Sequence, residues 1–233
     1  MSKSKGNVIY PETLIEKYGL DATKYFLLKE LSGGQDGVFT PEGFVERYNS
    51  ELCNDLGNLL NRTIGMLNKY FNGDVPSKPE KLTDLDKELE NYIAEQIVLV
   101  EKEMDESHVS EALVELWKII SRANKYIDET MPWVLFKEEK TNELKDVMYH
   151  LVEALRKIAI LITPYMEETS KKMFEQLQIE DSNLMSWESL KLSPNYPENL
   201  KVVEKGTPLF LRLDLTEEEK FLKEEMNKML LVI

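Results

Sequence analysis

The amino-acid sequence predicts an all-α fold: an antiparallel helical bundle with an irregular C-terminal segment and a final helix. Two observations favour it. Apolar residues recur every three or four positions over long stretches, and helix-start and helix-stop residues bound those stretches. With 233 residues, of which 42% are apolar and 31% charged, the chain can bury a core of ordinary globular composition. Short connections between successive helices are typical of an antiparallel bundle.

The first long helix is expected to begin at Thr40-Pro41 and to end at Asn72-Gly73. A threonine hydroxyl can cap a helix, and proline suits the first helical position because an N–H there would have no partner anyway. Between these ends, apolar residues keep a helical period at Leu52, Leu56, Leu59, Leu60, Ile64, Leu67 and Phe71. Residues 75–79 are expected to be a linker because they include two prolines.

The second and third helices are expected to form a hairpin. The second opens on the capping box Thr83-Asp84-Leu85-Asp86 and extends to about Met104. The third extends from about Ser107 to Thr130, and Met131-Pro132 ends it.

The later part of the chain has a weaker pattern. Apolar residues between Leu144 and Ile162 mark a fourth helix, after a short polar connection that follows the third. A fifth begins or kinks at Pro164 and reaches about Leu177. Residues 179–216 have no sustained period and are expected to lie on the bundle as an irregular segment. Residues 217–230 are expected to form the final helix, because glutamates at its start suit the helix dipole.

Composition excludes several classes of site and partner. The formal net charge of −14 disfavours indiscriminate binding to a polyanion, so no DNA partner is expected. One cysteine, Cys53, excludes an internal disulfide, and two histidines, His108 and His150, leave little for zinc, so no metal site is expected. The sequence has no apolar run of about 18 residues and no apolar signal core, so no membrane partner is expected and the predicted location is the cytoplasm.

A polar stripe follows the first long helix on the side opposite its apolar residues. Asn58, Arg62, Gly65 and Lys69 share it. Asn58 and Arg62 are four positions apart and can therefore reach one target together. An amide and a guanidinium both form forked hydrogen bonds in a plane, which is how proteins recognise base edges. The competing interpretation is an ordinary solvated helix face.

The third helix contributes a basic row. Its apolar face contains Trp117, which is therefore expected to be a core residue, and Lys118, Arg122 and Lys125 are expected to lie away from that face. These three cations and Lys69 are candidate phosphate contacts.

Trp133 occupies a different position, directly after Pro132 at a helix end. A side chain at such a corner can be presented to solvent, where an indole is a stacking platform for an unpaired base. The alternative is a ring that plugs the end of the bundle.

Four stretches resemble the methionyl-tRNA synthetase family of class I aminoacyl-tRNA synthetases. MSKSKGNVI, residues 1–9, is similar to the class signature Lys-Met-Ser-Lys-Ser without its leading lysine. DGVFTPEGFVERYNSELCNDLGNLLNRT, residues 36–63, resembles the entrance to the anticodon-binding helices of this family, and ANKYIDETMPW, residues 123–133, resembles its second anticodon-facing element. GTPLFLRLD, residues 206–214, is similar to a late segment that more often has proline at the position of Leu211. The resemblance covers essentially the whole chain.

The resemblance implies a function for the polar stripe and the corner tryptophan. In this family the matching Asn-x-x-x-Arg pair and the tryptophan after proline recognise the CAU anticodon, so it implies anticodon-binding roles for Asn58, Arg62 and Trp133. The implied partner is the anticodon stem-loop of tRNA(Met).

The resemblance also implies a part in catalysis for the signature. Lys3 would stabilise the phosphates of ATP, used with Mg in the full-length enzyme, on a loop that also contains Ser2 and Ser4. The nucleotide-binding fold of the family is expected upstream, as a missing N-terminal catalytic domain. The chain alone is therefore expected to be inactive and to hold no bound cofactor.

Three regions are expected on this basis: residues 1–35 as the signature-loop remnant with connecting helices, 36–178 as the anticodon-binding bundle, and 179–233 as a segment and helix packing back on it. Two alternatives stay open. One is the anticodon-binding part of another class I synthetase, such as the leucine or isoleucine enzyme. The other is a helical interaction or oligomerisation module with no RNA role.

Overall fold

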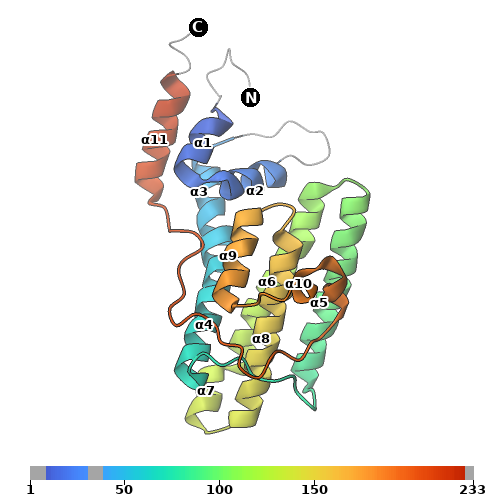
Figure 1. The fold of residues 1–233 in the computed structure, drawn as a ribbon. Helices are drawn as coiled ribbons and strands as arrows, with labels where there is room; N and C mark the ends of the chain where they lie inside the picture. The colour runs from blue at the N-terminus through green and yellow to red at the C-terminus, as the bar shows by residue number, and fades with distance from the viewer. Residues whose placement is uncertain (1–8, 31–38, 229–233) are drawn as a thin grey trace.

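The computed structural model describes residues 9–30 and 39–228, and Ser2, Lys3 and Ser4 lie outside these residues. The described part is helical with no strand, which confirms the all-α prediction (Figure 1). Its elements are α1 (Pro11–Tyr18), α2 (Leu20–Glu30), α3 (Pro41–Arg47), η2 (Tyr48–Gly57), α4 (Asn58–Phe71), α5 (Asp84–Asp105), α6 (Val109–Thr130), α7 (Pro132–Lys137), α8 (Thr141–Ile162), α9 (Glu167–Leu177), α10 (Ser182–Met185), η3 (Trp187–Lys191) and α11 (Leu215–Lys228). None of the described helices has the length and apolar character that a membrane crossing requires.

The first long helix is a continuous helical run made of α3, η2 and α4. Thr40 caps it as expected, with its hydroxyl accepting from the backbone N–H of Gly43 at 3.1 Å. Its end is also as expected, because Asn72 adopts a left-handed conformation with φ 54°. The sequence pattern did not predict that residues 48–57 are wound as a π-helix. The polar stripe begins at Asn58, after this segment, so the regular α-helical spacing of its members holds.

The bundle core is built around α8, nearly all of which is buried from Leu144 to Ile162. Helices α5 and α6 pack against each other as a hairpin, and α8 packs against α6 and α9 (Figure 1). The capping box that opens α5 is confirmed: Asp86 N–H donates to the Thr83 hydroxyl, and Thr83 N–H donates to the Asp86 carboxylate.

Helices α1, α2 and α11 lie at one end of the bundle and α7 at the other (Figure 1). The final helix begins at Leu215, two residues before the expected start, and it packs on α3. Glu218 of α11 accepts a hydrogen bond from Tyr18 and lies 2.6 Å from Lys17 Nζ, so α11 is also attached to α1.

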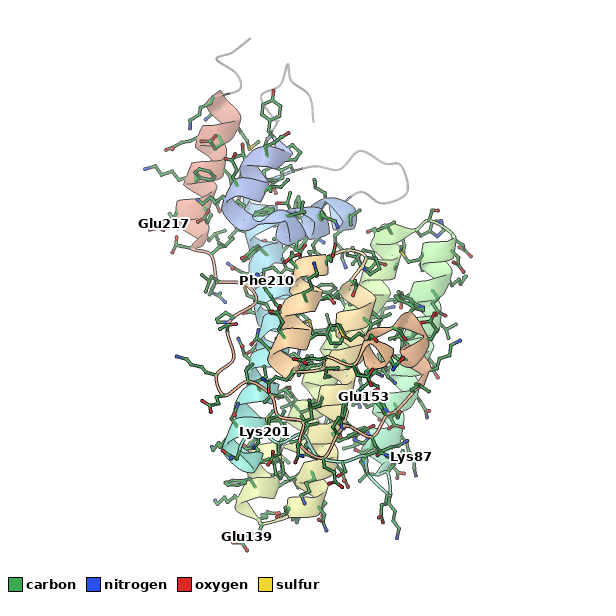
Figure 2. All side chains as sticks on the ribbon, in the orientation of Figure 1. Lys87, Glu139, Glu153, Lys201, Phe210 and Glu217 are labelled. Atoms are coloured by element: carbon green, nitrogen blue, oxygen red, sulfur yellow. The ribbon has the colours of Figure 1, made fainter. Side chains whose placement is uncertain are left out.

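The segment between α9 and α11 lies across the bundle largely without regular structure, as expected, apart from the short helices α10 and η3. A buried arginine attaches it to α8. Arg156 is fully buried, pairs with Glu153 at 2.6 Å, and donates to the carbonyl oxygens of Leu184 (2.7 Å) and Ser189 (3.0 Å). Figure 2 labels Glu153 on α8 and Lys201 further along the segment, where Val202 N–H donates to the carbonyl oxygen of Gly73 at 2.9 Å.

Helix α7 corrects the expectation of a plain polar connection after Met131. Pro132 starts the helix, since proline is favoured at the first helical position, and the helix ends at Lys137. Tyr70, at the end of α4, stacks on Phe136 with ring centroids 4.6 Å apart and planes inclined by 27°. This contact fixes α7 against α4, so the two elements that contain the candidate residues are neighbours.

Candidate nucleic-acid interface

Arg62 lies where α4 meets the end of α6. Its Nη2 is 3.3 Å from the carboxylate of Asp128, and its side chain is 34% exposed. A second contact joins α6 to η2, the element directly before α4, because the Asn124 side-chain amide donates to the Asp55 carbonyl oxygen at 3.1 Å. A guanidinium has five N–H donors, so one carboxylate leaves several free for an incoming acceptor. Arg62 is therefore oriented by the protein and still available to a ligand.

The remaining stripe residues face solvent. Asn58, Gly65 and Lys69 are all exposed, while Leu59 and Ile64, on the opposite side of α4, are buried. A Cβ built on Gly65 would meet no atom within 4 Å, so the helix surface beside Arg62 is open. The predicted geometry of the stripe is confirmed.

Trp133 is presented at the corner between α6 and α7. Met131 ends α6 in a left-handed conformation with φ 45°, which turns the chain, and Pro132 is then buried. The Trp133 side chain follows on the outside and is 44% exposed, which does not fit a ring plugging the bundle. Trp117, by contrast, is 6% exposed and packs on Tyr25, which confirms its expected core position.

The basic row of α6 is not uniform, and the expectation for Arg122 was wrong. The Arg122 side chain is only 7% exposed and lies 3.3 Å from Glu88 and 2.9 Å from Glu129. Because α5 packs along this side of α6, Arg122 joins the two helices rather than facing solvent. Lys125 is 67% exposed and pairs loosely with Glu129 at 3.3 Å, and Lys118 pairs with Glu115 at 2.7 Å.

The surroundings of these residues are partly acidic. Asp128 is largely exposed beside Arg62, and Asp55 lies on η2. Burial raises the pKa of Asp55 above its usual value, and the nearby Glu51 carboxylate raises it further. Burial also raises the pKa of the Tyr70 phenol. The candidate site therefore places one oriented cation next to carboxylates that repel unselective polyanions.

The two histidines do not resemble catalytic groups. His150 is 2% exposed, with Nδ1 2.7 Å from the Asp146 carbonyl oxygen and Nε2 3.0 Å from a Glu90 carboxylate oxygen. His108 lies with Glu103 and Glu106 at the turn between α5 and α6, where one ligand atom from each falls within 4.8 Å of the others. Among the described residues this group alone has metal-ligand spacing, and two of its members are exposed. The turn lies at the opposite end of the bundle from α7 (Figure 1).

Sequence reasoning missed Asp128, Tyr70 and Phe136. Asp128 meets Arg62 only because α4 and α6 meet, and 66 positions separate the two in the chain. Phe136 follows Trp133 by three positions, a spacing that places both on one face once residues 132–137 are known to be helical.

Two family models match most of the chain. A family model described as "Anticodon binding domain of methionyl tRNA ligase" matches residues 75–222, and one described as "tRNA synthetases class I (M)" matches residues 1–64. The methionine–tRNA ligase of Bacillus subtilis is 52% identical over 228 residues, 97% of this chain, and that of Enterococcus faecalis is 51% identical over 229 residues, 98% of it. The chain spans 34% of the length of each of these relatives.

A solved structure of Mycobacterium tuberculosis methionyl-tRNA synthetase in complex with methionyl-adenylate has the same architecture. It is 33% identical, with a TM-score of 0.82, and the match covers 91% of this chain and 41% of that one. The structure of its apo form gives a TM-score of 0.81 at 31% identity, covering 89% of this chain and 42% of that one. The chain therefore belongs to the methionyl-tRNA synthetase family and contains the anticodon-binding domain of that family.

Proposed function

We propose that the chain recognises the CAU anticodon of tRNA(Met) through Asn58, Arg62 and Trp133, here called the recognition surface. The observation that supports it most is the pairing of an exposed indole with an oriented guanidinium on neighbouring elements. Trp133 is 44% exposed on α7, and Arg62 on α4 is oriented by Asp128 on α6.

Each residue of the recognition surface would contribute a different interaction. Anticodon bases that leave their stack need a new apolar face, and an indole supplies one worth about 1–3 kcal/mol per base. The forked donors and acceptors of Arg62 and Asn58 would then pair with the polar edges of the base, which would otherwise be desolvated without partners. Selectivity would follow from the penalty on a base whose edge leaves these groups unpaired.

We propose the exposed lysines as the phosphate contacts. Lys69 is exposed on α4, the same helix as Arg62, and Lys125 is exposed on α6. Lys118 is partly neutralised by Glu115, and Arg122 is excluded because it is buried between two carboxylates. Contacts of this kind position RNA without selecting its sequence.

In the whole enzyme this chain would act together with a catalytic domain that uses ATP and Mg to activate methionine, in the cytoplasm. Lys3 would then stabilise the phosphates of ATP, flanked by Ser2 and Ser4. Since the chain spans 34% of the length of its relatives, we propose that the chain alone charges no tRNA.

The test is a titration of the chain with RNA stem-loops that differ only in the anticodon. Tighter binding of the CAU loop than of a loop with its first anticodon base changed would support the proposal. Equal affinity for the two loops would overturn recognition of CAU. No binding to any loop at low salt would favour an interaction module without an RNA role.

A further inference from the structure

We propose that Phe136 and Tyr70 form a second stacking platform, which accepts another unpaired base of the RNA loop bound at Trp133. The inference rests on the proposed function and adds a binding position to it.

The exposed face of α7 is aromatic and cationic. In this six-residue helix, Trp133 is 44% and Phe136 is 47% exposed, and Lys137 is also exposed. Trp133 and Phe136 are three positions apart and therefore project from the same side of the helix. Two large aromatic rings exposed this close together need an explanation, since such groups are usually buried in a chain that does not bind a partner through them.

Tyr70 packs against the inner face of the exposed Phe136 ring. The two rings are stacked at 4.6 Å, with Tyr70 partly buried and Phe136 on the outside. A planar base placed on the outer ring would extend a stack that already exists. The protein would have little side-chain freedom to lose on binding, because the Tyr70 ring already restrains Phe136.

A cavity of about 620 Å³ opens beside this pair, between the end of α4, α7 and the start of α8. Its lining residues include both aromatic residues of the pair, the polar residues Lys137, Glu139 and Thr141, and the apolar Phe71, Leu135 and Leu144. Aromatic faces with a few polar groups are typical of pockets for planar ligands. The cation can meet a phosphate, and the carboxylate or hydroxyl can meet the polar edge of a base.

The backbone holds α7 in place at both ends. Met131 before the helix and Glu139 after it are both left-handed, with φ 45° and 56°, a conformation that non-glycine residues adopt only when the surrounding structure imposes it. Lys140 N–H donates to the Leu135 carbonyl oxygen at 2.9 Å, which closes the second corner. Figure 2 shows Glu139 at the outer tip of the molecule, in the connection to α8. The platform is thus preorganised at an accessible end of the bundle.

An RNA base fits this surface better than an apolar protein segment. Lys69 Nζ lies 5.7 Å from the Tyr70 ring centroid, so a cation borders the stack on the α4 side, and Lys137 follows Phe136 on α7. The platform is also continuous with Trp133 through the same short helix. Aromatic rings alternating with cations are how proteins hold successive bases of a single strand.

The experiment uses the CAU stem-loop with 2-aminopurine, whose fluorescence is quenched by stacking, placed at each loop position in turn. We expect quenching on binding at one loop position that depends on Trp133 and at a second that depends on Phe136. In Phe136→Leu the second signal should be lost and the first kept, with affinity lowered at least about fivefold. Phe136→Trp should restore the second signal.

A matched control is Tyr10→Leu, because Tyr10 has the same exposed fraction of 47% but precedes α1 at the opposite end of the bundle. It should change neither signal. If wild type prefers CAU and Trp133→Ala weakens it while Phe136→Leu alters neither affinity nor fluorescence, the second platform is overturned and the proposed function stands. If no loop binds, both fail. If Phe136→Leu changes only the sedimentation of the chain, the face contacts a second copy and the platform is again overturned.

Discussion

The guanidinium of Arg62 on α4 lies 3.3 Å from the carboxylate of Asp128 on α6. Both side chains are at least one-third exposed, so the pair itself contributes little to stability. Under the proposed function, its effect would be on binding: Asp128 would orient Arg62, compete with RNA for it, and repel phosphates near the recognition surface. A base would then have to offer better hydrogen bonds than the Asp128 carboxylate already provides.

Asp128→Asn should raise the affinity of the chain for RNA loops and weaken its selectivity for the CAU loop over loops with altered anticodons. Removing the carboxylate frees Arg62 and lowers the local negative charge, so loops with altered anticodons gain more than the CAU loop does. The measurement is the ratio of dissociation constants for altered and CAU loops at two salt concentrations. Asp181→Asn, at the start of α10, serves as the control because it changes the net charge equally. An unchanged ratio in Asp128→Asn would contradict the account.

Trp133→Ala should weaken binding of the CAU loop by about 1–3 kcal/mol, the usual value of one base stacked on an aromatic ring. Because the indole is 44% exposed, the thermal midpoint of unfolding should stay near that of wild type. Loop titration and thermal melting of the same sample check both parts. A large loss of thermal stability would show that the ring is part of the core.

Arg156→Met should destabilise the fold by about 3–5 kcal/mol, because the buried Glu153 carboxylate loses its close cation and keeps only Lys157, at 3.6 Å, and the Tyr196 hydroxyl. It also removes the hydrogen bonds that attach the segment around Ser189 to α8. Denaturant unfolding gives the value. Lys223→Met breaks an exposed pair with Glu42 and should leave the unfolding midpoint unchanged. Equal midpoints for the two variants would argue against this anchoring role.

Asp55→Asn should stabilise the chain at neutral pH. The pKa of Asp55 is raised above 3.8, first by burial and then by Glu51, so the folded chain holds this proton more tightly than the unfolded chain. The stabilisation from the protonated form is complete below the unfolded pKa and is lost as pH rises through the folded pKa. Asparagine has no proton to lose at this position, so the variant does not undergo that loss. Its free energy of unfolding in urea should therefore exceed that of wild type at about pH 7 and equal it at about pH 4.

The control is Glu180→Gln, an exposed carboxylate after α9. A constant difference between Asp55→Asn and wild type across this pH range would contradict the assigned pKa shift.

Helices whose signals are local were predicted correctly from the sequence. The capping box at Thr83, the proline start at Pro41 and the left-handed stop at Asn72 each depend on a few neighbouring residues. Helix α7 was missed because its six residues are too few to show a period, and because Met131 ends one helix directly before the next begins. The π-helix was missed because Tyr48, Leu52 and Leu56 recur every four residues, a spacing too short-lived to distinguish an α-helix from a π-helix.

The sequence also predicted only those parts of the candidate site that depend on local spacing. Asn58, Arg62 and Lys69 lie on one regular helix, so their common face follows from spacing alone. The positions of Arg122, Asp128 and Phe136 depend on which helices pack together. Arg122 is covered by α5, Asp128 meets α4, and Phe136 meets Tyr70, and none of these contacts has a signal in the local sequence.

The most direct test of the recognition surface compares Arg62→Ala with Lys69→Ala, since both residues lie on the same stripe of α4. The quantity is the ratio of affinities for the CAU loop and a loop with its first anticodon base changed. If Arg62 pairs with a base edge, Arg62→Ala should reduce this ratio by the factor that corresponds to about 1–3 kcal/mol of binding free energy. Lys69→Ala should weaken both loops alike and leave the ratio unchanged. A uniform loss of affinity in both variants would contradict base recognition by Arg62 and reduce it to a phosphate contact.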